Sequence, residues 1–454
     1  MDMILSDYFE PGAAVHVARA PARLDVMGGI ADYSGSLVLE GTLGRHARVF
    51  VATHSRPFLR TITVGISDPD VRPDASFPLA AFHANGHLVD YDAARAIFSE
   101  DPSTRWTSYV GGCLYVLLAE TKLPCPESGI DIVLVSNIPL GAGVASSAAI
   151  EVATMVALTD LLGLKLDDLT LASLCQAVEN RIVGAPCGIM DQVTCALGEP
   201  NKLLALKCQP HKLQGMHLLP TGTVAVGINS NVRHCVAGKA YTRARVAAFM
   251  GLGIIGHRAA GEHFGGYLCN INPETFASDY QELLPQEIRG QEYLDRYGET
   301  PDTVTRVDPE ETYRIRSCSE HPIYENDRVH RFLKHLQAAT GKRRHNELVA
   351  AGELMYESHD SYGNRCSLGC PETDFIVDLV RKQGPENGLF GAKITGGGGG
   401  GTVAVLLEET SLKIIDDIVA VYSEETGVKG EVFTGTLPGA LRRRVDRAIV
   451  EADR

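Results

Sequence analysis

The chain has 454 residues, which is enough for two or three domains with buried cores. Its apolar fraction of 44% and charged fraction of 22% are ordinary for a globular protein. The net charge of −14 and the pI near 5.5 argue against a general nucleic-acid or anionic-membrane surface, although a local basic pocket stays compatible with them. The sequence shows no apolar run of about 18 residues and no basic-then-apolar signal pattern at its start. We therefore expect a cytoplasmic protein without membrane or nucleic-acid partners.

The N-terminal half alternates between strand-like and helix-like segments. Apolar and small residues alternate over 15–52 around a Gly-rich turn, which predicts strands joined by a loop. The β-branched run "GIDIVLVS" (129–136) predicts another strand. Apolar spacing then predicts a helix over 146–164, and "LASLCQAVENRIVGA" (171–185) predicts a second helix that a glycine and a proline stop.

The C-terminal half begins with the strand-like run "TVAVGINSN" (223–231). Residues 251–327 are more polar, rich in Glu and Pro and poorly periodic, which predicts an elaborated surface region or a long insertion. Helical spacing resumes over 326–339, and "FIVDLVRKQG" (375–384) predicts a helix with a Gly stop. Six consecutive glycines (396–401) lie between two strand-like runs.

This mixture of strands and helices in both halves predicts an α+β protein of two domains. We place the N-terminal domain at 1–212 and the C-terminal domain at 213–454, with the elaborated region of about 251–327 inside the second. The boundary follows from the polar stretch that starts near residue 209.

The first segment that indicates chemistry is the Gly-rich loop in "IPLGAGVASSAAIEVA", between the predicted strand and helix. Glycines such as Gly141 and Gly143 let backbone N–H groups approach an anion without a Cβ clash. A helix that begins at Ser146 or Ser147 adds its unpaired N–H groups and the positive end of its dipole. Phosphate is the ligand that such a loop favours, and a tight turn without a ligand is the alternative. The loop lacks the GK[ST] ending of a Walker loop and the spacing of a dinucleotide fingerprint.

A second segment, "GAPCGIMDQVTCALG", carries the lone acid Asp191 among apolar and small residues. A buried carboxylate without a partner is costly, so Asp191 is either satisfied by hydrogen bonds or has a function. In the third segment, 396–401, six glycines cost folding entropy of roughly 0.5–1 kcal/mol each relative to alanine in regular structure. A disordered linker is one interpretation of this run. Because β-branched residues flank it closely, an approach of backbone to a ligand explains it better.

Together, "ARLDVMGGIADY", "IPLGAGVASSAAIEVA", "CGIMDQ" and "GAKITGGGGGG" resemble, in this order, motifs of the GHMP kinases, in particular of the galactokinase and L-arabinokinase group. The resemblance covers nearly the whole chain. It implies a two-domain GHMP kinase fold with the active site between the domains. It also implies a sugar 1-kinase that uses ATP and Mg²⁺, which fits a chemistry of positioning and electrostatic stabilisation.

The resemblance assigns roles to single residues. Asp191 resembles the aspartate that activates or orients the anomeric hydroxyl, either as a true base or as an orienting charge. Arg23 resembles the arginine that pairs with this aspartate and stabilises charge on the phosphoryl group. Ser147 and Glu179 resemble the magnesium ligands, with the choice between Ser146 and Ser147 left open.

Further positions resemble binding residues of the family. Sugar contacts are implied for Asp32, Gly188 and Tyr241. Nucleotide contacts are implied for the Gly-rich loop and for Trp106, Tyr109, Gly397 and Gly398, although a plain core role suits the single tryptophan equally well.

One departure from the galactokinases concerns substrate choice. They carry Glu-His where this chain has Gly29-Ile30, and their glutamate is expected to bind the hydroxyl on the sixth carbon of the sugar. L-arabinopyranose has the ring stereochemistry of galactose but lacks that carbon. We therefore expect conversion of L-arabinose and ATP to L-arabinose 1-phosphate and ADP, and a shift toward galactose in Gly29→Glu, with discrimination of about 1–3 kcal/mol. A galactokinase of relaxed specificity and a non-catalytic, kinase-like sugar sensor are the alternatives.

Overall fold

The computed structural model describes residues 5–66, 68–233, 237–258 and 264–451. Within them, the N-terminal part is built on an eight-stranded sheet of order β16-β1-β2-β7-β3-β4, in which β8 also pairs with β2 and β9 pairs with β8. All neighbours are antiparallel except β3 and β7. The strands are β1 (Ala14–Met27), β2 (Leu37–His54), β3 (Phe58–Val64), β4 (Asp74–Pro78), β7 (Gly129–Ser136), β8 (Lys202–Lys207), β9 (Lys212–Leu218) and β16 (Asp446–Ile449).

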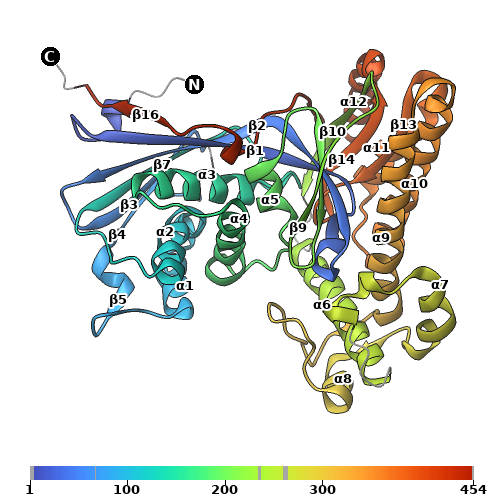
Figure 1. Ribbon diagram of the computed structural model, residues 1–454, viewed down its shortest axis with the longest axis horizontal. Helices are drawn as coiled ribbons and strands as arrows, with labels where there is room; N and C mark the ends of the chain where they lie inside the picture. Colours follow the sequence, from blue (N-terminus) through green and yellow to red (C-terminus); the bar gives the residue numbers. More distant parts are fainter. Residues whose placement is uncertain (1–4, 67, 234–236, 259–263, 452–454) are drawn as a thin grey trace.

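Helices cover one face of this sheet (Figure 1). They are α2 (Thr107–Thr121), α3 (Ser146–Leu161), α4 (Asp168–Ala177) and α5 (Met190–Leu197), with α1 (Tyr91–Ser99) and the small hairpin of β5 (His83–Ala84) and β6 (His87–Leu88) at the edge. The sequence of α3 is apolar nearly all round because the helix packs on β1, β2, α2 and α5 at once. A π-helical turn, Val178–Val183, follows α4 and ends at Gly184, with φ +79°, which confirms the predicted glycine stop.

The C-terminal part contains a second sheet, four-stranded in the described residues, in the order β13-β14-β10-β15. Helices α10 and α11 pack on it, and α12 packs on α11 (Figure 1). The elements are β10 (Thr223–Arg233), β13 (Leu389–Ile394), β14 (Gly400–Glu408), β15 (Glu431–Phe433), α10 (Arg344–Cys366), α11 (Pro371–Gln383) and α12 (Leu412–Thr426). The glycine-rich segment, which we define as residues 396–401, joins β13 to β14 as a tight connection and is no linker.

A lobe lies below this sheet in Figure 1. It is formed by α6 (Ala237–Arg258), α7 (Pro273–Thr275), α8 (Gly290–Tyr297), the short pair β11 (Ile288–Arg289) and β12 (Thr312–Tyr313), and the start of α9 (Ile315–Ala338). The region of about 251–327, of which 259–263 lie outside the described residues, is the predicted elaboration and contains helices. Its Phe276 and Tyr293 belong to a buried cluster that also includes Ile30 and Tyr362. Helix α9 begins at Ile315, and not near 326 as the spacing predicts, because it continues through the buried Pro322.

The strand pairing departs from the predicted domain division in two places. The boundary at 212/213 falls inside β9, which pairs with β8 of the N-terminal sheet. At the other end of the chain, β16 pairs antiparallel with β1, so that Ile449 lies opposite Ala14 (Figure 1). Such long-range pairing carries no local sequence signal. Among the described residues, no helix combines the length and apolar character needed to cross a membrane.

Candidate active site

A cavity of about 280 Å³ lies where the N-terminal sheet, the lobe and the glycine-rich segment meet. It collects most of the residues that the sequence predicts for catalysis and sugar binding. Its lining is Arg23, Ile30, Asp32, Ala185, Pro186, Cys187, Gly188, Met190, Asp191, Gly238, Tyr241, Thr242, Gly396, Gly397 and Gly398.

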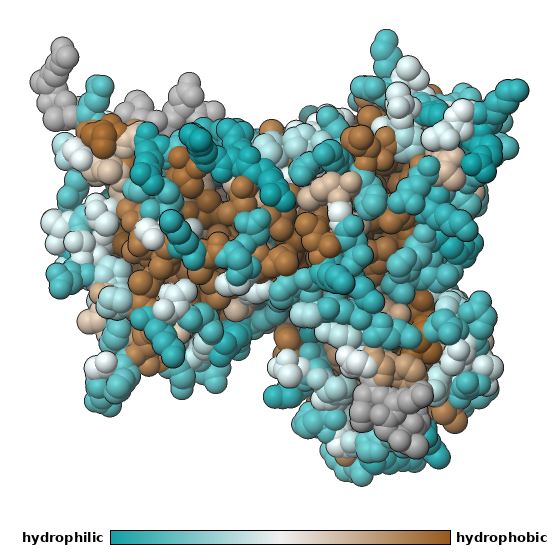
Figure 2. Space-filling view, in the orientation of Figure 1, coloured by the Kyte–Doolittle hydropathy of each residue, from teal (hydrophilic) through white to brown (hydrophobic). Residues whose placement is uncertain are grey.

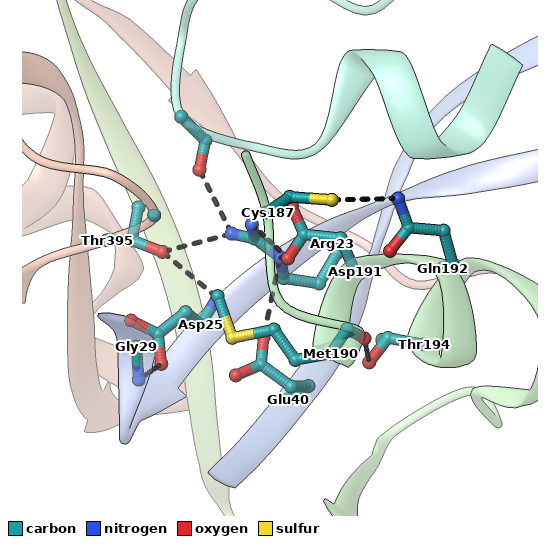
Figure 3. A network of polar contacts seen from close by, with 12 residues as sticks. Arg23, Asp25, Gly29, Glu40, Cys187, Met190, Asp191, Gln192, Thr194 and Thr395 are labelled. Atoms are coloured by element: carbon teal, nitrogen blue, oxygen red, sulfur yellow. Dashed lines mark hydrogen bonds and ion pairs between the residues drawn. The ribbon is translucent and has the colours of Figure 1, made fainter. Parts of the chain in front are cut away.

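An ion pair between Arg23 of β1 and Asp191 in the first turn of α5 lines the cavity (Figure 3). Both Arg23 Nε, at 2.9 Å, and Nη2, at 2.5 Å, donate to Asp191 Oδ1. Arg23 Nη1 donates to the carbonyl oxygen of Gly143, so most of the guanidinium is held by the protein. Arg23 is 2% exposed and Asp191 is 24% exposed. The arrangement fixes one carboxylate oxygen of Asp191, while the described residues give Oδ2 no hydrogen-bond donor.

Further buried charges lie behind this pair. Asp25, also on β1, binds Lys393 of β13 at 2.6 Å, and both side chains are fully buried. Glu40 of β2 is fully buried 3.4 Å from Arg23 Nε. Burial, and then the charge of Asp25, raises the pKa of Glu40 well above its usual range, while Arg23 opposes the rise. Charges taken from water need partners, so this network ties strands of both sheets to the Arg23–Asp191 pair.

The β7–α3 loop, residues 137–145, packs directly against the glycine-rich segment. Thr402 Oγ1 donates to the carbonyl oxygen of Ala142, and a Cβ at Gly396 or Gly401 would lie 2.7 Å from a loop carbonyl oxygen. A Cβ at Gly398 would lie 2.6 Å from the carbonyl oxygen of Leu368. These glycines are therefore required by contacts between protein backbones, not only by a ligand. A Cβ at Gly397 would meet only Tyr241 Cδ2 within 4 Å among the described residues beyond its chain neighbours, at 3.8 Å. This position is therefore open to the cavity.

Ser147 and Glu179 come together beside Asp191. Burial, and then the charge of Asp191, raises the pKa of Glu179 to about 7, while hydrogen bonds from Ser147, Cys187 and Gln192 lower it. Gln192 Nε2 donates to Glu179 Oε2 at 2.8 Å. Ser147 therefore neighbours Glu179, and the choice between Ser146 and Ser147 as a metal ligand stays a prediction. A cation bound beside Glu179 would offset the burial and the repulsion from Asp191 and would favour the ionised carboxylate. The described residues contain no cluster of three or more His, Cys, Asp or Glu that could hold a metal.

The two aromatic residues predicted near the nucleotide differ in their surroundings. Trp106 is the N-cap of α2, and its indole N–H donates to the carbonyl oxygen of Arg72 at 2.9 Å. Burial, and then the charges of Glu179 and Glu151, raises the pKa of Tyr109. Tyr109 therefore feels the charge of Glu179, whereas the indole N–H of Trp106 is bound to protein backbone.

Gly29 does not line the cavity. Its φ is +47°, and a Cβ there would lie 1.7 Å from the Tyr362 hydroxyl oxygen and 2.9 Å from Asp25 Oδ2. A side chain at this position would meet protein atoms before it reached a sugar. The expectation that Gly29→Glu alone brings a carboxylate to the sugar is therefore corrected, while Ile30 does line the cavity.

Asp32 lies beside Gly188, where a Cβ would be 1.6 Å from Asp32 Oδ2, so the glycine makes room for this carboxyl group. Burial, and then the charge of Asp191, raises the pKa of Asp32 to about 7, and Arg245 opposes the rise. Between a pH of about 4 and about 7 the folded protein keeps a proton that the unfolded chain loses. The free energy of unfolding should therefore fall as the pH rises through this range.

We expect Asp32→Asn to raise the melting temperature, and to raise it more at about pH 8 than at about pH 5, because the amide carries no charge to bury. Thermal unfolding at both pH values measures the effect. Asp302→Asn is the control, and we expect it to lower the melting temperature instead of raising it. Asp302 binds Arg245 at 2.8 and 2.9 Å, and that arginine lowers the pKa of Asp302 against the effect of burial. Equal effects of Asp32→Asn at both pH values would refute the burial of a titrating carboxyl group.

Comparison with known proteins agrees with this geometry. Residues 108–199 match the GHMP kinases N terminal domain, and residues 337–424 match GHMP kinases C terminal. The chain belongs to the GHMP kinase family. Its α+β architecture is the GHMP kinase fold: the Lactococcus lactis galactokinase solved with galactose superposes with a TM-score of 0.73 at 21% identity over 94% of each chain. The Methanococcus jannaschii mevalonate kinase superposes with a TM-score of 0.56 at 15% identity over 93% of this chain and 98% of that one.

Two curated GHMP kinase relatives align over nearly the whole chain. L-arabinokinase of Arabidopsis thaliana is 38% identical over 95% of this chain. The chain spans about half the length of this plant relative, since the alignment covers 47% of it. Galactokinase of Actinobacillus pleuropneumoniae is 27% identical over 92% of both proteins.

In this GHMP kinase, sequence reasoning did not single out Asp25, Lys393 or Tyr362. The signals are a single acid in "RLDVM" and a single lysine in the otherwise apolar strand "LFGAKI". A single acid on one strand and a single lysine on another predict a buried ion pair only if the two strands are known to lie side by side. The sequence alone does not give that information. Tyr362 gives no signal, because a tyrosine on an amphipathic helix is an ordinary core residue.

Proposed function

We propose that this protein transfers the γ-phosphoryl group of ATP to the anomeric hydroxyl of L-arabinose. The geometry of Asp191 carries the proposal: Arg23 holds Oδ1, and the partly exposed carboxyl group lines a cavity of sugar size. A carboxylate that is oriented by a buried cation and left with a second oxygen is suited to accept a proton or hydrogen bond from a hydroxyl group.

In the proposed step, the anomeric oxygen attacks the γ-phosphorus, and the bond from this phosphorus to the β,γ-bridging oxygen breaks. ADP leaves with the bond electrons, and the hydroxyl proton passes toward Asp191. Arg23 keeps Asp191 in place and adds a fixed positive charge beside the reacting groups. Because phosphoryl transfer needs little covalent chemistry from the protein, such positioning accounts for most of the expected rate gain.

The phosphates of ATP find donors at the β7–α3 loop. Helix α3 is 16 residues long and begins at Ser146, after Ala145 in the left-handed region with φ 59°. The unpaired N–H groups of its first turn favour an anion. Ser147 and Glu179 would hold Mg²⁺ together with the phosphates, and the ion would neutralise charge on them.

The choice of L-arabinose rests on the sugar side of the cavity. Ile30 lines the cavity and is apolar, so it offers no acceptor for a hydroxyl on a sixth carbon, and Gly29 behind it has no side chain to supply one. The 38% identity to a plant L-arabinokinase supports the same choice. Asp32 and Tyr241 line the cavity and can serve the ring hydroxyls that both sugars share.

Sugar-dependent release of ADP from ATP and Mg²⁺ tests this function. We expect release with L-arabinose, none without sugar, and a product whose phosphorus couples to the anomeric proton in NMR. If L-arabinose, D-galactose and D-galacturonate all fail to release ADP, the result would favour the non-catalytic sugar sensor over this proposal.

We also expect Gly397→Ala to raise the KM for ATP about tenfold, which corresponds to about 1.4 kcal/mol of binding. The new methyl group would face the cavity, so the melting temperature should not change. Gly398→Ala is the matched control. Gly398 has a φ of +77°, and its new Cβ would lie 2.6 Å from the Leu368 carbonyl oxygen, so this substitution should lower the melting temperature. A Gly397→Ala protein that binds ATP normally would mean that the segment serves only as a turn.

A further inference from the structure

The missing side chain at Gly29 is matched by a tyrosine from a distant helix. Tyr362 lies on α10 and is fully buried. Its hydroxyl oxygen is 1.7 Å from where a Cβ of residue 29 would be, and its Cζ is 2.9 Å away. The phenol thus occupies the space into which any side chain at position 29 would project.

The same hydroxyl group joins two walls of the cavity. The backbone N–H of Ile30 donates to Tyr362 Oη at 2.9 Å. Tyr362 in turn donates to the carbonyl oxygen of Gly396 at 3.2 Å. Ile30 and Gly396 both line the cavity. One buried phenol therefore sets the position of the apolar sugar-facing residue relative to the glycine-rich segment.

Tyr362 is itself held in place. Its ring centroid is 5.2 Å from Lys393 Nζ, and His321 packs edge-on against the ring at 5.2 Å. Lys393 binds Asp25, whose Oδ1 accepts the backbone N–H of Gly29 at 3.0 Å. Gly29, Asp25, Lys393 and Tyr362 thus form a closed buried ring of contacts, in which a shift at one member must move the others.

We propose that Gly29 and Tyr362 are one specificity-determining unit, in which the phenol takes the place of a side chain at position 29 and holds Ile30 against the sugar. Tyr362 is a positioning residue, because it reaches the sugar only through Ile30. A carboxylate at position 29 can serve a hexose only when residue 362 is small enough to admit it. The catalytic part of this inference rests on the proposed sugar kinase function, and the packing part stands independently.

The packing part is tested by a double-mutant cycle of Gly29→Ala and Tyr362→Leu in chemical unfolding. We expect Gly29→Ala to be less destabilising in the Tyr362→Leu background by at least about tenfold in the unfolding constant, because the clash partner is gone. If Gly29→Ala does not fold alone, recovery of a folded protein in the double variant gives the same answer. Additive effects would overturn the proposal.

The catalytic part is tested by the ratio of kcat/KM for L-arabinose to that for D-galactose. We expect Tyr362→Phe to lower this ratio while keeping most of the stability, because Ile30 loses its anchor. Gly29→Glu alone should not favour galactose, whereas Gly29→Glu with Tyr362→Leu should lower the ratio by about tenfold or more. A shift to galactose in Gly29→Glu alone, or none in the double variant, would overturn the proposal.

The chain offers a matched control pair in the lobe. A Cβ at Gly253 of α6 would lie 2.3 Å from the hydroxyl oxygen of the buried Tyr293, and neither residue lines the cavity. Gly253→Ala and Tyr293→Leu should couple in stability without changing the sugar ratio. If the control variants change the ratio of kcat/KM for L-arabinose to that for D-galactose as much as the Gly29 and Tyr362 variants do, Tyr362 has only a structural role. If the wild type converts no sugar, the proposed function fails, and the unfolding cycle still decides the packing.

Discussion

Asp191→Asn is expected to lower kcat about 10²–10⁴-fold, the range that a positioned acid–base group contributes. The amide keeps the size of the side chain, and its oxygen can still accept from Arg23, so sugar and nucleotide binding should be retained. Steady-state kinetics gives kcat, and calorimetry with L-arabinose gives the binding constant. We expect this large loss of kcat because no other carboxylate could replace Asp191. Among the described residues that line the cavity, only Asp191 accepts a hydrogen bond from Arg23 through a carboxylate.

Asp295→Asn is the control, since Asp295 is exposed on α8 and bonds only to Gln291 among the described residues. It should leave kcat unchanged. An Asp191→Asn enzyme that keeps more than about a tenth of the wild-type kcat would remove Asp191 from proton transfer. Loss of sugar binding together with kcat would instead assign it to the binding of the ground state.

Lys393→Met should have the largest effect on stability. It removes the partner of the fully buried Asp25, and breaking a buried ion pair on one side costs about 3–5 kcal/mol. Chemical unfolding measures the loss. Adding Asp25→Asn should recover much of it, because the amide can still accept the Gly29 N–H and carries no charge.

The matched control is an exposed pair. Arg296 binds Glu292 at 2.7 Å on α8, with the two side chains 61% and 46% exposed. Arg296→Met should cost only about 0.3–0.5 kcal/mol, as exposed helix pairs do. If Lys393→Met is no worse than this control, the Asp25–Lys393 pair does not hold the two sheets together.

The residues of the candidate site lie in short motifs that can be recognised in the sequence. Asp191, Arg23 and Asp32 could be predicted because they belong to short motifs, and the structure brings them to one cavity. Ser147 and Glu179 could be predicted as a pair in the same way, and the motif alone leaves the choice between Ser147 and Ser146 open. The roles of these residues stay predictions until the variants are measured.

Features that depend on contacts between distant segments could not be predicted. The pair of Asp25 and Lys393 joins residues 368 positions apart. Likewise, β16 returns to β1, and helix α9 includes Pro322, because tertiary packing overrides the local preference. Gly29 is the sharpest case: its missing side chain suggests an open sugar pocket, whereas Tyr362 fills the space from α10.

The glycine-rich segment has one feature that the sequence predicts and one that depends on contacts between distant segments. Its flanking β-branched residues indicate that the ends are fixed, and they do belong to β13 and β14. The sequence does not distinguish Gly397, which is open to the cavity, from Gly396 and Gly398, which pack on backbone. That distinction requires the neighbours, which come from the β7–α3 loop and from the turn after α10. In Figure 2, hydrophilic residues in teal lie mostly toward the outside of the molecule, and hydrophobic residues in brown gather across its centre.

The most direct test of the account is the kcat/KM of the wild-type protein for L-arabinose and for D-galactose, measured as sugar-dependent ADP release with ATP and Mg²⁺. The Asp191–Arg23 pair, to which we assign phosphoryl transfer to a sugar hydroxyl, lines the cavity, and the apolar Ile30 in the same wall offers no acceptor for a hydroxyl on a sixth carbon. We therefore predict turnover of both sugars or of L-arabinose alone, with the higher kcat/KM for L-arabinose. A wild-type enzyme that prefers D-galactose would contradict the assignment of substrate, and the absence of ADP release with every sugar would contradict the kinase itself.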